Sequence, residues 1–237
     1  MNKFGFKTLH IAALPKSGST WLKNLLSELT QFGSTVPPDP NADMENHDLP
    51  DEENFSHIVN SNSVVKLHTR CNDRNLSIIK SLGFKTVILK RNLRDQCVSN
   101  YFYILKTKSH RHNGLYTKIS KDDGLFHRAT ITIEEYAPWV NDWNEIACRE
   151  INSFKMFSYE SLIDETFETL SSIVNFFDLK IPSKEIEECI NMIASKTSFN
   201  FDSTDTLGYS LARKGIVGDW KNHFDPRHVS LFEEFGH

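Results

Sequence analysis

Two glycine-punctuated stretches, far apart in the chain, carry cations beside backbone that can approach a ligand closely. One reads Leu14-Pro15-Lys16-Ser17-Gly18-Ser19-Thr20-Trp21, and the other runs from Arg213 to Phe224 as Arg-Lys-Gly-Ile-Val-Gly-Asp-Trp-Lys-Asn-His-Phe. Lysine and arginine attract anions, and glycine leaves neighbouring backbone N–H groups open to them. Together, the two stretches indicate a site for a nucleotide with anionic groups at both ends.

The first stretch is predicted to join a strand to a helix. The apolar run Thr8–Leu14 predicts a buried strand, and apolar residues at helical spacing from Trp21 to Leu29 predict a helix that ends at Gly33. Such a turn presents free N–H groups and the positive end of a helix dipole to an anion. It differs from the common phosphate loop because Lys16 precedes the single glycine. Taken alone, it is equally compatible with an ordinary strand–helix turn.

Two further groups of residues follow predicted strands. Arg91 ends the predicted strand Lys85–Lys90, and Ser99 follows eight residues later in a predicted helix, so the two could grip one phosphate. An Arg–Asp pair at the helix start explains the same residues. In the predicted strand Ser63–Thr69, alternation places Lys66 and His68 on one face. Histidine can accept a proton near neutral pH, although a polar sheet edge is the alternative.

In combination, these motifs resemble the cytosolic-type sulfotransferases, which use 3′-phosphoadenosine 5′-phosphosulfate (PAPS) as donor. The resemblance extends over most of the chain, from about Leu9 to Phe224, and suggests a short, bacterial-type member. Residues 16–21 resemble the family's 5′-phosphosulfate loop, and Arg91 with Ser99 matches its 3′-phosphate motif, spacing included. The Arg-Lys-Gly-x-x-Gly-Asp-Trp-Lys-Asn-x-Phe signature is highly specific to the family.

The resemblance implies a role for each matched residue. Lys16, Ser19 and Thr20 would hold the 5′-phosphosulfate, with Ser17 and Gly18 shaping the loop. Trp21 and Phe199 would sandwich the adenine, and Tyr159 would contact its edge. Arg91, Ser99 and residues 213–215 would bind the 3′-phosphate, and Thr197 lies in an adenine-contacting segment. The expected donor site is therefore Lys16, Ser17, Gly18, Ser19, Thr20, Trp21, Arg91, Ser99, Tyr159, Thr197, Phe199, Arg213, Lys214 and Gly215.

The same resemblance implies a mechanism. His68 would be the general base that deprotonates the acceptor, Lys16 would stabilise charge on the departing bridging oxygen, and Lys66 would assist at the transferring group. Sulfonyl transfer, like phosphoryl transfer, depends on in-line positioning and charge stabilisation. These cations could replace a magnesium ion, so no metal is expected.

The pattern of elements predicts an α/β fold. Strands alternate with helices at Asp95–Leu105, Glu134–Ile151, Glu165–Phe177 and Ser183–Ser195, which indicates a single domain over 1–237 with a central parallel sheet flanked by helices. Ligands in such sheets bind at the carboxyl ends of the strands, where each motif falls. Residues 34–60 and 106–133 are expected to be acceptor-side or mobile loops. The last forty residues are expected to be loop-rich.

Composition narrows the class of protein. The 237 residues carry a net charge of −4, which does not favour a basic face for nucleic acid. No run is long and apolar enough for a membrane span, the N-terminus does not read as a signal peptide, and the cysteines are widely spaced. We therefore expect a cytoplasmic protein with reduced thiols, acting on a small-molecule acceptor, without nucleic-acid or membrane partners. Oligomeric state is not readable.

The acceptor is less well indicated. Acids in residues 39–53, together with Asp122, Asp123, Glu134 and Glu135, could favour a polar or cationic acceptor such as a guanidinium alkaloid, or could be solvated loop acids. Phe102, Tyr103, Trp139 and Trp143 could line an apolar part of the pocket or belong to the core. Hydroxyl and amine acceptors are both open. The alternatives are a metal-dependent nucleotide kinase of the phosphate-loop class and a non-catalytic module that binds PAPS or its product PAP.

Overall fold

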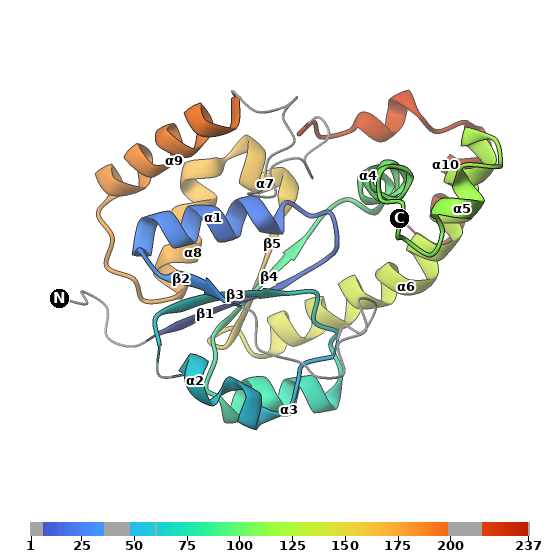
Figure 1. Ribbon diagram of the computed structural model, residues 1–237. Helices are drawn as coiled ribbons and strands as arrows, with labels where there is room; N and C mark the ends of the chain where they lie inside the picture. Colours follow the sequence, from blue (N-terminus) through green and yellow to red (C-terminus); the bar gives the residue numbers. More distant parts are fainter. Residues whose placement is uncertain (1–6, 36–47, 60, 199–214, 237) are drawn as a thin grey trace.

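A five-stranded parallel sheet lies at the centre of the molecule (Figure 1). The computed structural model describes residues 7–35, 48–59, 61–198 and 215–236. The strand order is β2-β3-β1-β4-β5, with β1 in the middle. The strands are β1 Thr8–Ala13, β2 Gly33–Thr35, β3 Ser63–Leu67, β4 Thr86–Lys90 and β5 Phe154–Ser158. The predicted α/β fold with a parallel sheet and flanking helices is confirmed.

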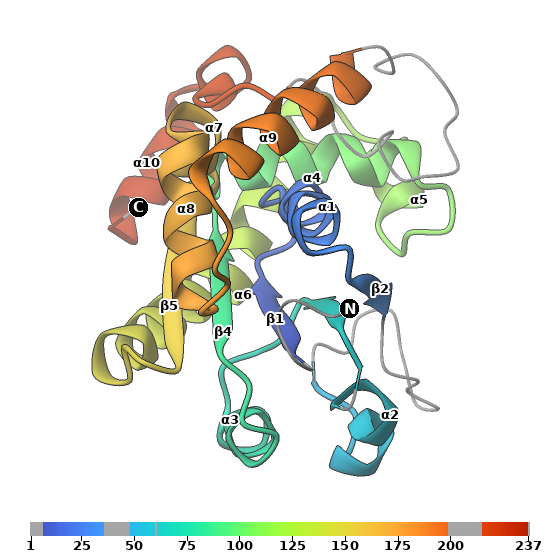
Figure 2. The same cartoon turned by 90° about the vertical axis from the view of Figure 1, so that its left-hand side faces the viewer.

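Helices cover both faces of the sheet, so β1 is buried on both sides and is apolar throughout most of its length. Leu9, Ile11 and Ala13 pack into the core under α1, α8 and α9, whereas Ala12 packs against α3 and α6 on the other face (Figures 1 and 2). The helices are α1 Ser19–Thr30, α2 Ser56–Val59, α3 Asp73–Ser81, α4 Leu93–Lys106, α5 Asn113–Tyr116, α6 Lys121–Arg149, α7 Tyr159–Asp164, α8 Thr166–Phe176, α9 Ser183–Ser198 and α10 Pro226–Glu234, with 3₁₀ turns η1 Glu52–Phe55 and η3 Asp219–Asn222.

The prediction that 106–131 is irregular is wrong, because α5 and the first turns of α6 lie within this segment. The Ser120 hydroxyl accepts a hydrogen bond from the Asp123 backbone N–H at 3.1 Å and caps α6. Buried positions in these turns include Arg128 and Thr132 beside apolar residues. Polar residues on the buried face interrupt the helical spacing of apolar residues, which is the signal that predicts a helix from sequence.

Smaller differences concern the ends of elements. α1 ends at Thr30 with Gln31 as a left-handed cap, so Gly33 begins a strand and does not terminate the helix. A capping box at Asp225 starts α10 in a segment predicted to be loop-rich. β3 ends at Leu67, which places His68 just beyond the carboxyl end of the strand. None of the described helices is both long and apolar enough to cross a membrane.

Candidate active site

Three motifs that are distant in sequence meet around the ring of Tyr159, the first residue of α7. The Arg91 guanidinium lies 4.2 Å from the ring centroid. A Cβ added to Gly18 would come within 2.6 Å of ring atom Cδ2, and one added to Gly215 would lie 3.9 Å from the tyrosine hydroxyl. The loop after β1, the end of β4 and the C-terminal segment therefore share one site.

Arg91 ties these loops together. Its Nη1 donates to the Lys16 carbonyl at 3.1 Å, and its Nη2 donates to the Ile216 carbonyl at 3.4 Å. Its Nε is buried and has no partner among the described residues, and the same holds for the Ser17 hydroxyl. Buried polar groups are normally hydrogen-bonded, so these two point to a polar ligand at this place.

The loop before α1 has the backbone of an anion-binding turn. Lys16 and Gly18 both have positive φ, 67° and 79°, and Gly18 is the N-cap of α1. Left-handed residues in such a turn direct successive N–H groups inward, and the helix N-terminus adds its positive dipole end. Ser19 is buried in the first turn, where Trp21 packs against the core beneath α1. The predicted strand–loop–helix is confirmed.

Two partly buried lysines lie at this loop: Lys16 is within it, and Lys66 is near it. Burial, and then the charges of Arg91, Lys106 and Lys66, lower the pKa of Lys16 to about 8, and its Nζ lies 4.5 Å from the centroid of the Tyr103 ring. Burial, and then Lys23, lower the pKa of Lys66. A concentration of cations in a partly dehydrated site favours a ligand with several negative charges.

His68 is held in a defined tautomer. Its Nδ1 lies 2.7 Å from the Ala13 carbonyl oxygen, which can only accept, so Nδ1 carries the hydrogen and the neutral ring has its lone pair on Nε2. The next residue is fixed as well, because Trp139 and Trp143 donate to the Thr69 carbonyl at 2.8 and 3.1 Å. Both tryptophans are buried core residues, as one interpretation of the sequence expected.

Asp95 holds the C-terminal segment in place, a role that the sequence analysis missed. This buried carboxylate accepts from the Gly218 N–H at 2.6 Å and from the Trp220 N–H at 3.0 Å. Arg94 lies 4.7 Å from the centroid of the Trp220 ring. The Gly-Asp-Trp part of the signature is therefore a docking turn on α4, and it places Gly215 beside Tyr159.

Comparison with known proteins decides the family. The sulfotransferase domain family matches residues 7–237, nearly the whole chain. The chain belongs to the sulfotransferase family. The resemblance drawn from the motifs is therefore confirmed.

Curated sulfotransferases match over most of their length. The guinea pig (Cavia porcellus) 3-alpha-hydroxysteroid sulfotransferase is 25% identical over 93% of this chain and 79% of its own. Mouse (Mus musculus) sulfotransferase 2A2 is 26% identical over 98% of this chain and 85% of its own. Mouse SULT7A1, crystallised with PAP, has the same fold with a TM-score of 0.68 at 19% identity, covering 99% of this chain and 84% of that one.

Several predicted donor residues of this sulfotransferase cannot be placed. Phe199, Arg213 and Lys214, and the side chain of Thr197, lie outside the described residues. Ser99 is half-buried on α4, and the structure records no contact between it and Arg91. The roles assigned to the donor residues stay predictions, although the structure brings together the loop 16–18, Arg91, Tyr159 and Gly215.

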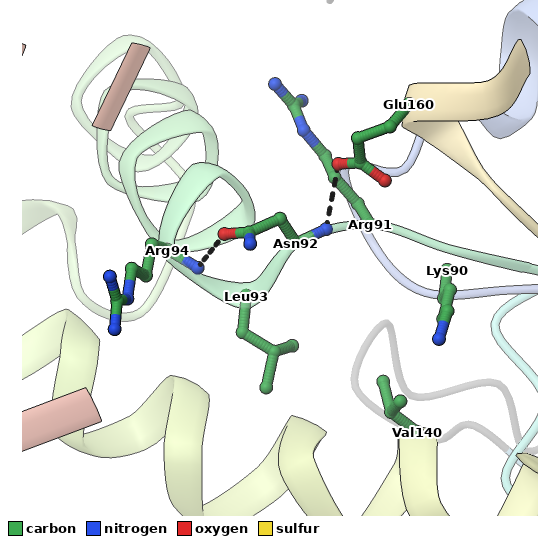
Figure 3. Close-up of a pocket in the computed structure, with 7 residues that line it drawn as sticks. All are labelled: Lys90, Arg91, Asn92, Leu93, Arg94, Val140 and Glu160. Carbon is green, nitrogen blue, oxygen red and sulfur yellow. Dashed lines mark hydrogen bonds between the residues drawn. The ribbon is translucent and has the colours of Figure 1, made fainter. Parts of the chain in front are cut away.

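A hollow of about 330 Å³ lies beside the sulfotransferase site and shares Arg91 with it. In Figure 3 the Arg91 and Leu93 side chains point to opposite sides of the segment that joins β4 to α4. The N–H groups there are already satisfied: Asn92 donates to Glu160 at 2.9 Å, and its side chain accepts from Arg94 at 3.0 Å. These two N–H groups are therefore not available to a phosphate in the hollow.

Several of the described acids near the predicted rim of the acceptor pocket have partners of their own. Asp48 accepts from Asn72 and Asn75, and Asp51 pairs with Arg74 at 2.7 Å. Asp39, Asp43 and Glu45 lie outside the described residues. Among the described residues, no group of three or more His, Cys, Asp and Glu side chains is placed to hold a metal ion.

Proposed function

We propose that this sulfotransferase moves a sulfonate group from PAPS to a hydroxyl or amine of a small-molecule acceptor by in-line transfer. The observation that carries the proposal is the meeting of Gly18, Arg91 and Gly215 on Tyr159. Arg91 also bonds the Lys16 carbonyl, and His68 bonds the Ala13 carbonyl at the end of β1. Two structural neighbours, mouse SULT7A1 and a retinol dehydratase, are complexes with PAP, the product expected from PAPS.

The residues present suit such a donor. Residues 16–21 offer inward N–H groups, hydroxyls and a lysine for the 5′-phosphosulfate, and Arg91 has an unpartnered buried Nε. Ser99, Arg213, Lys214 and Gly215 complete the proposed 3′-phosphate site. Trp21, Tyr159, Thr197 and Phe199 form the proposed adenine site. When bound, PAPS supplies an activated sulfonate on a phosphate leaving group.

Side chains of this protein can take up the acceptor's proton and stabilise the charge that develops during transfer. His68 Nε2 takes the proton from the acceptor, because Nδ1–H is engaged with the Ala13 carbonyl at 2.7 Å. Lys16 neutralises charge at the leaving oxygen, and Lys66 assists at the transferring group. Their burial strengthens these interactions by excluding water.

The broader assignments are part of the same proposal. They are one domain over 1–237, with 34–60 and 106–133 on the acceptor side, a cytoplasmic location and no nucleic-acid or membrane partner. The expectation of a cationic acceptor, such as a guanidinium alkaloid, was based on the cluster of acidic residues. The described acids support it poorly, because Asp48 and Asp51 are engaged with Asn72, Asn75 and Arg74.

The test is sulfonate transfer from radiolabelled PAPS to a panel of phenols, alcohols and amines, without added metal. We expect labelled product and stoichiometric PAP. If the protein transferred phosphate from ATP with magnesium and did not use PAPS, the kinase alternative would replace the proposal. If it bound PAPS but transferred nothing to any acceptor, the non-catalytic module would be favoured.

A further inference from the structure

Polar side chains line the buried seam between α4 and α6. On α4 they are Gln96 and Asn100, one turn apart; on α6 they are Arg128, Thr132 and Tyr136, at the same spacing. All five are buried. The two helices are in extensive contact and cross each other, because Figure 1 shows α4 end-on and α6 running obliquely past it; α5 contacts both. A polar seam inside a packed helix pair needs a compensating reason, because apolar residues would pack there at less cost.

Arg128 is the least compensated residue of the seam. Its side chain is only 3% exposed, and its one hydrogen bond to a described residue runs from Nε to the Thr132 hydroxyl at 3.3 Å. Its Nη2 is buried and has no partner in the part of the chain that the structure describes. Among the described residues, no carboxylate pairs with this guanidinium; Glu135, beside it on α6, pairs with Arg111 at 3.7 Å.

Aromatic contact does not replace a counter-charge. The Arg128 guanidinium lies 5.5 Å from the centroid of the Tyr136 ring, a weak cation–π contact. Arginine stays charged in proteins, so it cannot lower the cost of burial by losing its proton. A buried charge without a counter-charge costs stability, and a bound anion would remove much of that cost.

A second unsatisfied group lies close to Arg128. The Nδ1 of His112 is buried and has no partner among the described residues. Its ring packs against Tyr116 at 5.8 Å and His127 at 5.6 Å between centroids. Burial, and then Arg111 and Arg128, lower the pKa of His112 to about 4, so the ring is neutral near pH 7 and can donate one hydrogen bond.

The seam leads to the catalytic residues. Thr132 donates to the Gln96 side chain at 3.2 Å, and Gln96 donates to the Pro15 carbonyl of the donor loop at 3.2 Å. Further along α6, Trp139 donates to the carbonyl of Thr69, the residue after His68. A rise of 1.5 Å per residue places Arg128 and Trp139 on the order of 15 Å apart along the helix.

We propose that Arg128, with His112, binds a carboxylate of the acceptor, so that the substrate is a hydroxylated carboxylic acid. Its hydroxyl lies at His68 and its acid group lies on the order of 15 Å away, at the α4–α6 seam. A carboxylate matches the planar fork of a guanidinium and supplies the missing counter-charge. This inference rests on the proposed function, since it names the acceptor of the same site.

The test begins with binding to the PAP-saturated protein, measured by calorimetry. The probes are ω-hydroxy fatty acids of graded chain length and their primary amides, which are neutral and similar in shape. We expect the acids of matching length to bind about tenfold or more tightly than the amides, the gain of a charge-assisted pair. Equal binding of acids and amides, or no binding of the acids, would overturn the inference.

Two variants on α6 test whether the preference for acids over amides depends on Arg128. Arg128→Met should abolish the preference for acids and leave PAP affinity unchanged. Arg149→Met, in the last turn of the same helix and 58% exposed, should keep the preference. If inorganic phosphate alone bound in an Arg128-dependent way while acids and amides bound equally, the seam would take a free anion and the acceptor would be wrong.

Thermal stability provides an independent readout. An uncompensated charge costs stability, so unliganded Arg128→Met should melt at the same temperature as the unaltered protein or higher. A clear fall would assign Arg128 a structural role and contradict the inference. Failure of PAP itself to bind would refute the proposed function instead, and the inference would fall with it.

Discussion

The loop end of the sheet and the α4–α6 seam both hold buried donor groups without partners among the described residues, but they differ in what positions those groups. At the sheet end, backbone geometry dominates: Lys16 and Gly18 are left-handed, and Gly18 has no space for a Cβ. At the seam, side chains such as Arg128 and Thr132 project from regular helices. A site built from backbone constrains its sequence to glycine-punctuated motifs, whereas a site built from helical side chains leaves only an altered periodicity.

The comparison predicts that substitutions at the acceptor side change turnover while donor binding stays intact. His68→Ala should show this most strongly, because it removes the proposed base. We expect kcat to fall by about 10²- to 10⁴-fold, with PAP affinity unchanged within error. Steady-state kinetics give kcat, and calorimetry on the same preparation gives the affinity for PAP. Unchanged kcat would remove His68 from the mechanism.

Gly18→Ala tests the donor side. The new Cβ would meet the Tyr159 ring at 2.6 Å in a left-handed residue, so the loop or the ring must move. We expect PAP affinity to fall by about 100-fold, as for other displacements of about an ångström at a binding site. Gly83→Ala is the control, since Gly83 also has positive φ, at 65°, but meets nothing within 4 Å.

The control separates the backbone strain of an alanine with positive φ from the clash of its Cβ with the Tyr159 ring. Gly83→Ala should cost about 1 kcal/mol of stability and leave PAP affinity unchanged. If Gly18→Ala bound PAP as well as Gly83→Ala does, close approach at Tyr159 would not matter to the donor site.

Asp95→Asn addresses the docking of the C-terminal segment. The carboxylate accepts from two backbone N–H groups, at Gly218 and Trp220, and the amide would weaken both bonds. We expect PAP affinity to fall by about tenfold, because Gly215 would be held less firmly. Asp51→Asn, which removes a surface pair with Arg74, should leave PAP affinity unchanged. Equal affinities would show that the segment docks without Asp95.

The smallest expected effect concerns pH. The pKa of Lys16 is lowered to about 8, so this lysine loses its charge at a lower pH than an ordinary lysine does. Donor anions prefer the charged form, so PAP affinity should fall by about threefold between about pH 7.5 and about pH 8.5. Calorimetry across this range measures the slope, and Lys16→Met should remove most of it.

Stability should change in the opposite direction, over a window that extends from about pH 8 to 10.5. Below pH 8 the folded chain holds a buried charge that the unfolded chain exposes to water, at a cost. As pH rises from about 8 to the ordinary value of 10.5, the folded state loses this proton before the unfolded state does. This group therefore makes the unliganded protein more stable over that range.

More of the donor site than of the α4–α6 seam could be predicted from the sequence. The strand–loop–helix at Lys16 and the α/β sheet followed from glycine placement and apolar runs. The packing of Tyr159 on Gly18 and the grip of Asp95 on residues 218–220 did not, because each joins segments far apart in sequence. The start of α6 was missed because Arg128 and Thr132 occupy its buried face. That same irregularity of pattern marks the proposed acceptor subsite.

The central claim is that the loop 16–18, Arg91 and the C-terminal segment form one site for a nucleotide with two separated anionic groups. Calorimetric titration with adenosine 3′,5′-bisphosphate, with ATP and ADP alongside and no metal present, tests it most directly. The account predicts tight binding of the bisphosphate and weak or no binding of ATP and ADP. Preference for ATP, or no binding of the bisphosphate, would contradict it.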